Sequence, residues 1–162
     1  MNAWTIGSGT LALILAGAGV YLQVPNRTAS ATTAHYSITT PDDAASVGLC
    51  VPVIEGTGDA PRDGSVWLVI HGVSDVGYYL VRQVELRSDG EGWTVSKVQV
   101  GSSETANEQR YQLVLWRLDE ELTDAIGHIP KDHRVFDATP TGASEVSHPL
   151  TVKRRADSRH CE

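Results

Sequence analysis

His128, Asp132 and His133 form a short cluster of the side-chain types that bind divalent metals, with His148 and His160 as further ligands. Their spacing is not diagnostic of a zinc site, and the Gly, Pro and Lys residues around them are typical of a loop. We therefore interpret the cluster as exposed polar residues of a connector. We expect neither a metal nor another cofactor.

Residues 66–72, V-W-L-V-I-H-G, are the most enzyme-like string, because a hydrophobic strand ending in His-Gly resembles the oxyanion-loop region of α/β hydrolases. That class also needs a G-x-S-x-G nucleophile elbow, whereas G-V-S-D-V-G at residues 72–77 has one residue too many. We therefore expect no catalytic residues. A small hydrolase is kept only as a third hypothesis for the function.

Aromatic side chains can form a binding strip on one face of a sheet, because they supply much of the energy at protein interfaces. With one Phe and one Met in the chain, however, tryptophans and tyrosines must also fill the core. We expect Trp67 and Trp93 in the core. Tyr78 and Trp116 are left as candidates for binding a partner.

Composition excludes several classes of protein and partner. The chain has 162 residues, 41% hydrophobic and 20% charged, as expected for one folded domain. Its formal net charge of -7 repels phosphate backbones, so nucleic acid is not an expected partner. Two cysteines, Cys50 and Cys161, are too few for a disulfide framework or a four-cysteine zinc site, but they can close a large loop in an oxidising compartment.

The N-terminal region differs from the rest of the chain. After a tail of residues 1–5, residues 6–24 carry no charge and are long enough for a transmembrane helix. A cleaved signal peptide is the alternative, because Ala29, Ser30 and Ala31 imitate a cleavage site, but the basic segment that precedes such peptides is missing. We favour a single-pass anchor in the cell membrane.

Residues 25–49 are rich in Thr, Ser and Ala and are predicted to be a flexible linker that starts at Pro25. The positive-inside rule says little about how the predicted helix is oriented in the membrane, since Arg27 is the one basic side chain near its ends. A domain behind such a spacer suits surface display. We therefore expect the domain on the extracytoplasmic side.

Residues 50–154 alternate short β-rich runs with turn-forming clusters, which predicts an antiparallel sandwich. The run at 66–71 is expected to be central and buried on both faces. The turn S-D-G-E-G predicts a hairpin between 78–86 and 93–100. A change of hydrophobic phase in the second strand predicts a bulge near Ser96 and Lys97.

One short helix is predicted within this pattern. Asp119 can cap it, Glu120 and Glu121 suit its first turn, and Gly127 ends it. Residues 155–162 are expected to form a charged C-terminal tail.

Several short motifs resemble an immunoglobulin-like β-sandwich domain found in uncharacterised bacterial, especially actinobacterial, membrane-anchored proteins. They are Trp67-Leu68-Val69, Gly77-Tyr78-Tyr79, Gly90-Glu91-Gly92-Trp93, Leu113-Val114-Leu115 and Leu150-Thr151-Val152-Lys153-Arg154. The turn before Trp93 departs from the family pattern by one extra glutamate, Glu91. The resemblance implies a sandwich fold and an accessory or binding role, with no catalytic residues.

The function predicted from these features is a membrane-tethered, non-enzymatic interaction module that binds a protein partner. The alternative is a structural or accessory membrane subunit that is recognised through its anchor helix.

Overall fold

The computed structural model describes residues 35–88, 90, 92–102, 108–156 and 159–161. The predicted tail 1–5 and the predicted transmembrane helix 6–24 lie outside these ranges. Within them, no helix combines the length and the apolar character needed to cross a bilayer.

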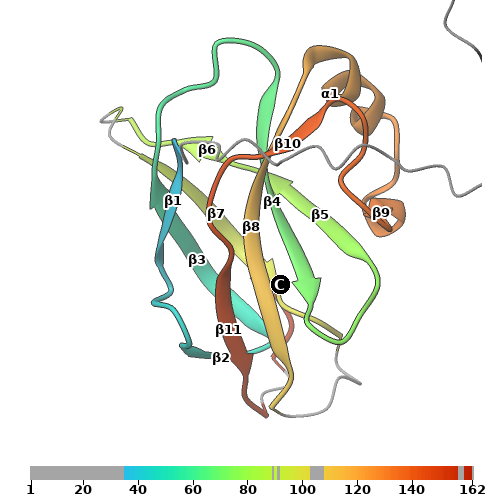
Figure 1. The fold of residues 1–162 in the computed structure, drawn as a ribbon. Coiled ribbons are helices and arrows are strands. Elements are labelled where there is room, and N and C mark those ends of the chain that lie inside the picture. Colours follow the sequence, from blue (N-terminus) through green and yellow to red (C-terminus); the bar gives the residue numbers. More distant parts are fainter. Residues whose placement is uncertain (1–34, 89, 91, 103–107, 157–158, 162) are drawn as a thin grey trace, which may run out of the picture. The chain divides into compact units, whose positions relative to one another are not determined.

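The described chain forms two β-sheets and one α-helix, so the prediction of a mainly β fold is confirmed (Figure 1). The smaller sheet has the order β1 (Ser37–Thr40), β3 (Cys50–Thr57), β7 (Trp93–Gln99), β6 (Glu85–Leu86). The larger has the order β2 (Ser46–Val47), β11 (Leu150–Arg154), β8 (Arg110–Leu118), β4 (Ser65–Gly72), β5 (Tyr78–Gln83), β9 (Val135–Phe136), while β10 (Ala143–Glu145) also pairs with β8.

The two sheets pack face to face around one apolar core. Alternate residues of β4 point into it, namely Val66, Leu68 and Ile70, and they meet Trp93 and Val95 of β7. Successive side chains of a strand point to opposite faces, so the other residues of β4 point away from this core.

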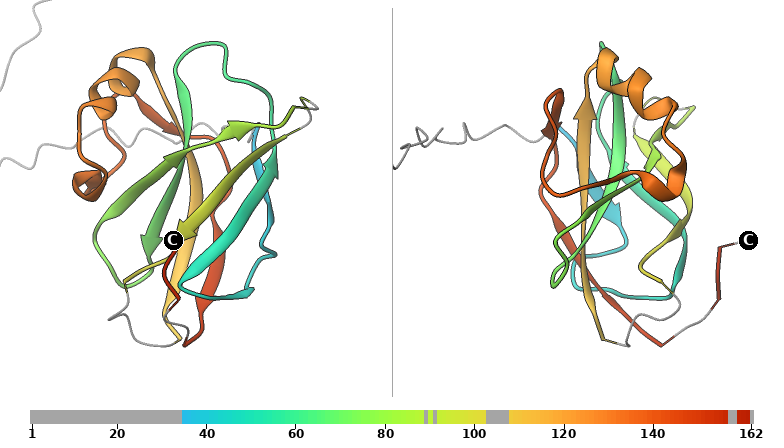
Figure 2. Two further views of the ribbon diagram at one scale, coloured as in Figure 1. Left: turned by 180° about the vertical axis from the view of Figure 1, so that it is seen from behind. Right: turned by 90° about the vertical axis from the view of Figure 1, so that its right-hand side faces the viewer.

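The outer face of the larger sheet holds a second apolar cluster. Trp67 and Val69 of β4 lie there with Trp116 of β8, and Ile126 of α1 (Glu120–Gly127) covers them. Figure 2 shows α1 and the segment leading to β9 together on one side of the molecule. β4 is therefore covered on both faces, as the sequence predicts.

α1 begins and ends where the sequence predicts. The Asp119 side chain accepts a hydrogen bond from the Leu122 amide, which caps the first turn. After Gly127 the chain runs through the 3₁₀ turn η1 (Lys131–His133) to β9.

The predicted hairpin between 78–86 and 93–100 is wrong in its first strand. β5 pairs with β4, and the chain leaves the larger sheet at Val84, whose amide donates to the Val66 carbonyl. Of residues 78–86, only the two residues of β6 pair with β7. Val84, at the point where the chain crosses from one sheet to the other, is buried in the core between them.

The change of phase in β7 takes another form than the predicted bulge. Trp93, Val95 and Val98 of β7 and Val100 just after it are all buried, and Lys97 adopts a positive φ of 53° next to Val98. The pairing of Val51 with Val98 and of Val53 with Ser96 nevertheless keeps one register, so β7 has no extra residue. Instead, β3 and β7 both switch which alternate side chains face the core, at the same level of the sheet. Pro52 of β3 lies at this point and has no N–H to donate.

The domain begins earlier in the chain than predicted, and its strands are not all antiparallel. The predicted linker ends too late, because β1 and β2 lie within 25–49 and Tyr36 is buried. Edge strands of polar, exposed residues lack the hydrophobic alternation by which strands are recognised. The sheets are also not wholly antiparallel, since β2 runs parallel to β11.

The C-terminal segment is attached covalently to the start of β3. Cys161 forms a disulfide with Cys50 across a sequence separation of 111 residues. Among the described residues, no cysteine is free.

Replacing Trp93 by alanine is expected to destabilise the domain by about 3–5 kcal/mol, the range for losing a buried large aromatic side chain. Trp93 is fully buried and its indole N–H donates to the Thr57 carbonyl. Urea unfolding followed by circular dichroism measures the change. Leu86→Ala, at an exposed position paired with Trp93, is the control and should change stability by about 0.5 kcal/mol or less. Equal effects of the two substitutions would contradict the core role of Trp93.

Candidate functional site

The two residues predicted to bind a partner lie together, but only one of them is accessible. The rings of Tyr78 and Trp116 are 5.3 Å apart between centroids, and Tyr78 stacks on His71 at 4.4 Å. Trp116 is fully buried and also packs against Phe136. Trp116 therefore fills the second apolar cluster, while the half-buried Tyr78 covers it from outside.

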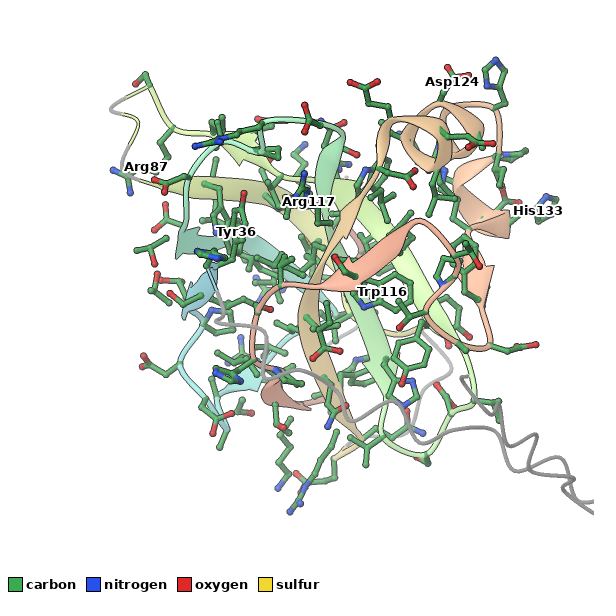
Figure 3. All side chains as sticks on the ribbon, turned by 45° about the horizontal axis from the view of Figure 1, so that its top comes forward. Tyr36, Arg87, Trp116, Arg117, Asp124 and His133 are labelled. Atoms are coloured by element: carbon green, nitrogen blue, oxygen red, sulfur yellow. A yellow bond between two sulfur atoms is a disulfide. The ribbon has the colours of Figure 1, made fainter. Side chains whose placement is uncertain are left out.

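The histidines considered as metal ligands are exposed but not all together: His128 and His133 lie in the segment after α1, His148 lies between β10 and β11, and His160 lies next to Cys161. His133 Nε2 lies 3.7 Å from the Asp132 carboxylate, whereas His128 contacts the backbone carbonyl of Asp124. Figure 3 shows Asp124 and His133 at the outer surface near α1 and η1. Within the described ranges, no three His, Cys, Asp or Glu side chains are placed to hold a metal ion.

The hydrolase-like string has a different geometry from a nucleophile elbow. Residues 72–77 connect two antiparallel strands, and the Asp75 amide donates to the Gly72 carbonyl across a tight turn. An elbow instead joins a strand to a helix. His71 contacts the Gly77 carbonyl through Nδ1 at 3.1 Å; because a carbonyl only accepts, Nδ1 carries the proton.

A cavity that the sequence analysis missed lies beside the turn between β4 and β5. Figure 1 shows this turn at the lower right. The volume of the cavity is about 390 Å³, within the range of small-molecule sites. It is lined by Ile70, Asp75, Tyr79, Val81, Gln99, Gly101, Ser102, Gln109 and Tyr111. These residues come from both sheets and from the segments beyond the strand ends.

Tyr111 forms one wall of this cavity, and Gly101 lets it come close. The Tyr111 hydroxyl donates to the Gln109 side-chain oxygen. Gly101 has a positive φ of 79°, and a Cβ there would clash with the same hydroxyl. A side chain at position 101 would therefore displace the ring.

Four exposed apolar side chains lie in or next to the hairpin formed by β4 and β5, and we call them the hairpin patch: Val73, Val76, Tyr79 and Val135. Val76, at the turn, is 78% exposed. Tyr79 pairs with Val135 across β5 and β9, and it also lines the cavity. The hairpin patch and the cavity thus share Tyr79.

One carboxylate provides the charge of the cavity wall. Asp75 is the only residue with a formal charge among the described lining residues. The guanidinium of Arg154 lies behind the wall, where it is buried and donates to the Ser102 carbonyl. The accessible charge of the site is therefore negative.

A second cavity, of about 530 Å³, lies near Tyr36 and Arg117, which Figure 3 labels. Arg117 forms an ion pair with Asp63 at 3.8 Å, and the Tyr36 hydroxyl donates to the Asp59 carbonyl. Burial raises the pKa of Tyr36, the charge of Arg117 opposes this, and Asp59 adds to it. Because these groups already bind one another, this cavity is the weaker candidate.

Comparison with protein-family models, with curated proteins and with solved structures found no match for this chain. One signal in the sequence pointed to the candidate site: the turn G-V-S-D-V-G holds two valines, where turns usually carry polar residues.

Gly101→Ala is expected to destabilise the domain by about 1–2 kcal/mol for the left-handed backbone alone, and further through the clash with Tyr111. Gly90→Ala is the matched control, because Gly90 has a similar φ of 73° and open space around it. Thermal unfolding of both variants measures the difference. Equal losses of stability in the two variants would show that the Tyr111 side chain moves aside with no loss of stability.

Proposed function

We propose that this chain is a membrane-tethered, non-enzymatic interaction module that binds a protein partner through the hairpin patch and the adjoining cavity. The observation that carries this proposal is the hairpin patch itself. Contiguous exposed apolar side chains on a folded domain are typical of interaction sites. Here one of them, Tyr79, also lines a cavity.

The fold we propose for the module is an immunoglobulin-like β-sandwich. In that fold, strands A, B, E and D form one sheet, and strands G, F and C form the other, with C′ added in the variable type. The order β1-β3-β7-β6 fits the first sheet, and the order β11-β8-β4-β5 fits the second. β9, β10 and α1 are additions to this plan.

We further propose that residues 6–24 anchor the module and that the domain lies outside the cytoplasm. The uncharged sequence of 6–24 supports the anchor. The disulfide between Cys50 and Cys161 supports the side, because disulfides persist in oxidising compartments and are rare in the cytosol.

Val76→Ser is expected to weaken capture of the partner from native membranes at least tenfold, or about 1.4 kcal/mol, when the full chain is the bait. Val76 is the most exposed apolar side chain of the hairpin patch. Val53→Ser is the matched control, since Val53 is an exposed valine of β3 in the smaller sheet.

Unchanged capture by Val76→Ser would remove the hairpin patch from the proposal. An exchange of residues 6–24 for an unrelated apolar helix tests the accessory-subunit alternative. An interaction module keeps its partner after this exchange, and a subunit recognised through its anchor loses it.

The proposed location predicts that protease added to intact cells removes the domain. It also predicts that thiol reagents label Cys50 and Cys161 only after reduction, because the two are paired. Immunoblotting and mass spectrometry measure the two results. Protection from protease, together with both thiols freely alkylated, would place the domain in the cytoplasm.

A further inference from the structure

We propose that the cavity beside the hairpin patch takes an arginine or lysine side chain of the partner protein. This inference rests on the proposed function and names the chemistry that the site recognises. It follows from the apolar floor of the cavity, from the acceptors left on its wall, and from the hairpin patch, which shares Tyr79 with it.

The floor suits the stem of a long side chain. Ile70 and Tyr111 belong to the core between the sheets, and Val81 packs against that core. Arginine and lysine carry three or four methylene groups that pack along apolar surface while the charged end stays with polar groups. The cavity thus offers apolar contact before the charge is reached.

The wall offers acceptors to the charged end. The Asp75 carboxylate makes no hydrogen bond or ion pair with any other side chain of the described ranges. The Gln99 amide nitrogen donates to the Gly101 carbonyl, which leaves the Gln99 side-chain oxygen to accept. Lysine and arginine are donors only, so their ends match a wall of unused acceptors.

An anionic ligand fits this wall poorly. Arg154 is the nearby cation, but its guanidinium is buried behind Gly101 and Ser102 and is held by the chain's own carbonyl. The net charge of the whole chain, -7, also favours the approach of a cation.

The surroundings favour a protein over a free amine or a lipid surface. The hairpin patch extends the apolar contact beyond what one small amine covers. Asp75 lies between Val73 and Val76 in the turn, and this carboxylate is repelled by an anionic membrane surface. A cationic side chain flanked by apolar residues uses both parts of the site.

The test uses the full chain, isotope-labelled, in a neutral detergent, and three blocked tripeptides: acetyl-Val-Arg-Val-amide and the same peptide with Gln or Glu in the centre. Amide NMR shifts of Tyr79 and Ser102, which line the cavity, report binding there. We expect saturable binding of the Arg peptide, at least tenfold tighter than that of the Gln peptide, and weaker in high salt.

Asp75→Asn is expected to weaken the Arg peptide at least tenfold, and Asp75→Glu, which keeps the charge, to retain most of the affinity. Asp137→Asn, at an exposed acid of the segment after β9, is the control and leaves binding unchanged. Circular dichroism checks that each variant is folded. Equal binding of the Gln peptide, tighter binding of the Glu peptide, or no effect of Asp75→Asn overturns the inference.

Two further arms separate the sources of the cation. Butylguanidine that binds as tightly as the Arg peptide overturns the protein partner, because the hairpin patch then contributes nothing. Shifts caused by anionic lipid in the micelle, with none from any peptide, overturn it in favour of a membrane. If no peptide binds but Val76→Ser still abolishes capture of the native partner, the inference falls and the proposed function stands.

Discussion

The rest of the structure depends on covering both faces of the larger sheet, because β4 and β8 carry large apolar side chains on each side. The smaller sheet covers one face, and α1 with the segment before β9 covers the other. Burial of one such side chain stabilises the fold by about 1.5–3 kcal/mol. α1 has eight residues and is too short to persist alone, so helix and sheet stabilise each other.

The elements that could be predicted are those with a local cause. A continuous apolar run predicts 66–71, and an N-cap with acidic residues after it predicts α1. β1, β2 and the crossing at Val84 could not be predicted, because they depend on pairing between distant segments. In β1, polar side chains face solvent at the sheet edge, so no alternation marks the strand.

The candidate site divides in the same way. The sequence predicts Tyr78 and Trp116 alike as candidates for binding a partner, but the burial of Trp116 depends on Phe136, twenty residues later and on another strand. The cavity brings together the end of β4, the start of β5 and the chain on both sides of residues 103–107. No sequence pattern spans such pieces. The valines of the turn are the one local indication of the site, because tight turns are usually formed by Gly, Pro and polar residues.

The bond between Cys50 and Cys161 also makes most of the domain a closed covalent ring. A single break of the backbone anywhere inside this ring leaves both pieces joined, so neither diffuses away. Each piece stays at a high effective concentration near the other, which favours reassembly over loss. The ring includes the whole hairpin patch, so one nick in an exposed loop between strands would not separate this patch from the N-terminal segment of the chain.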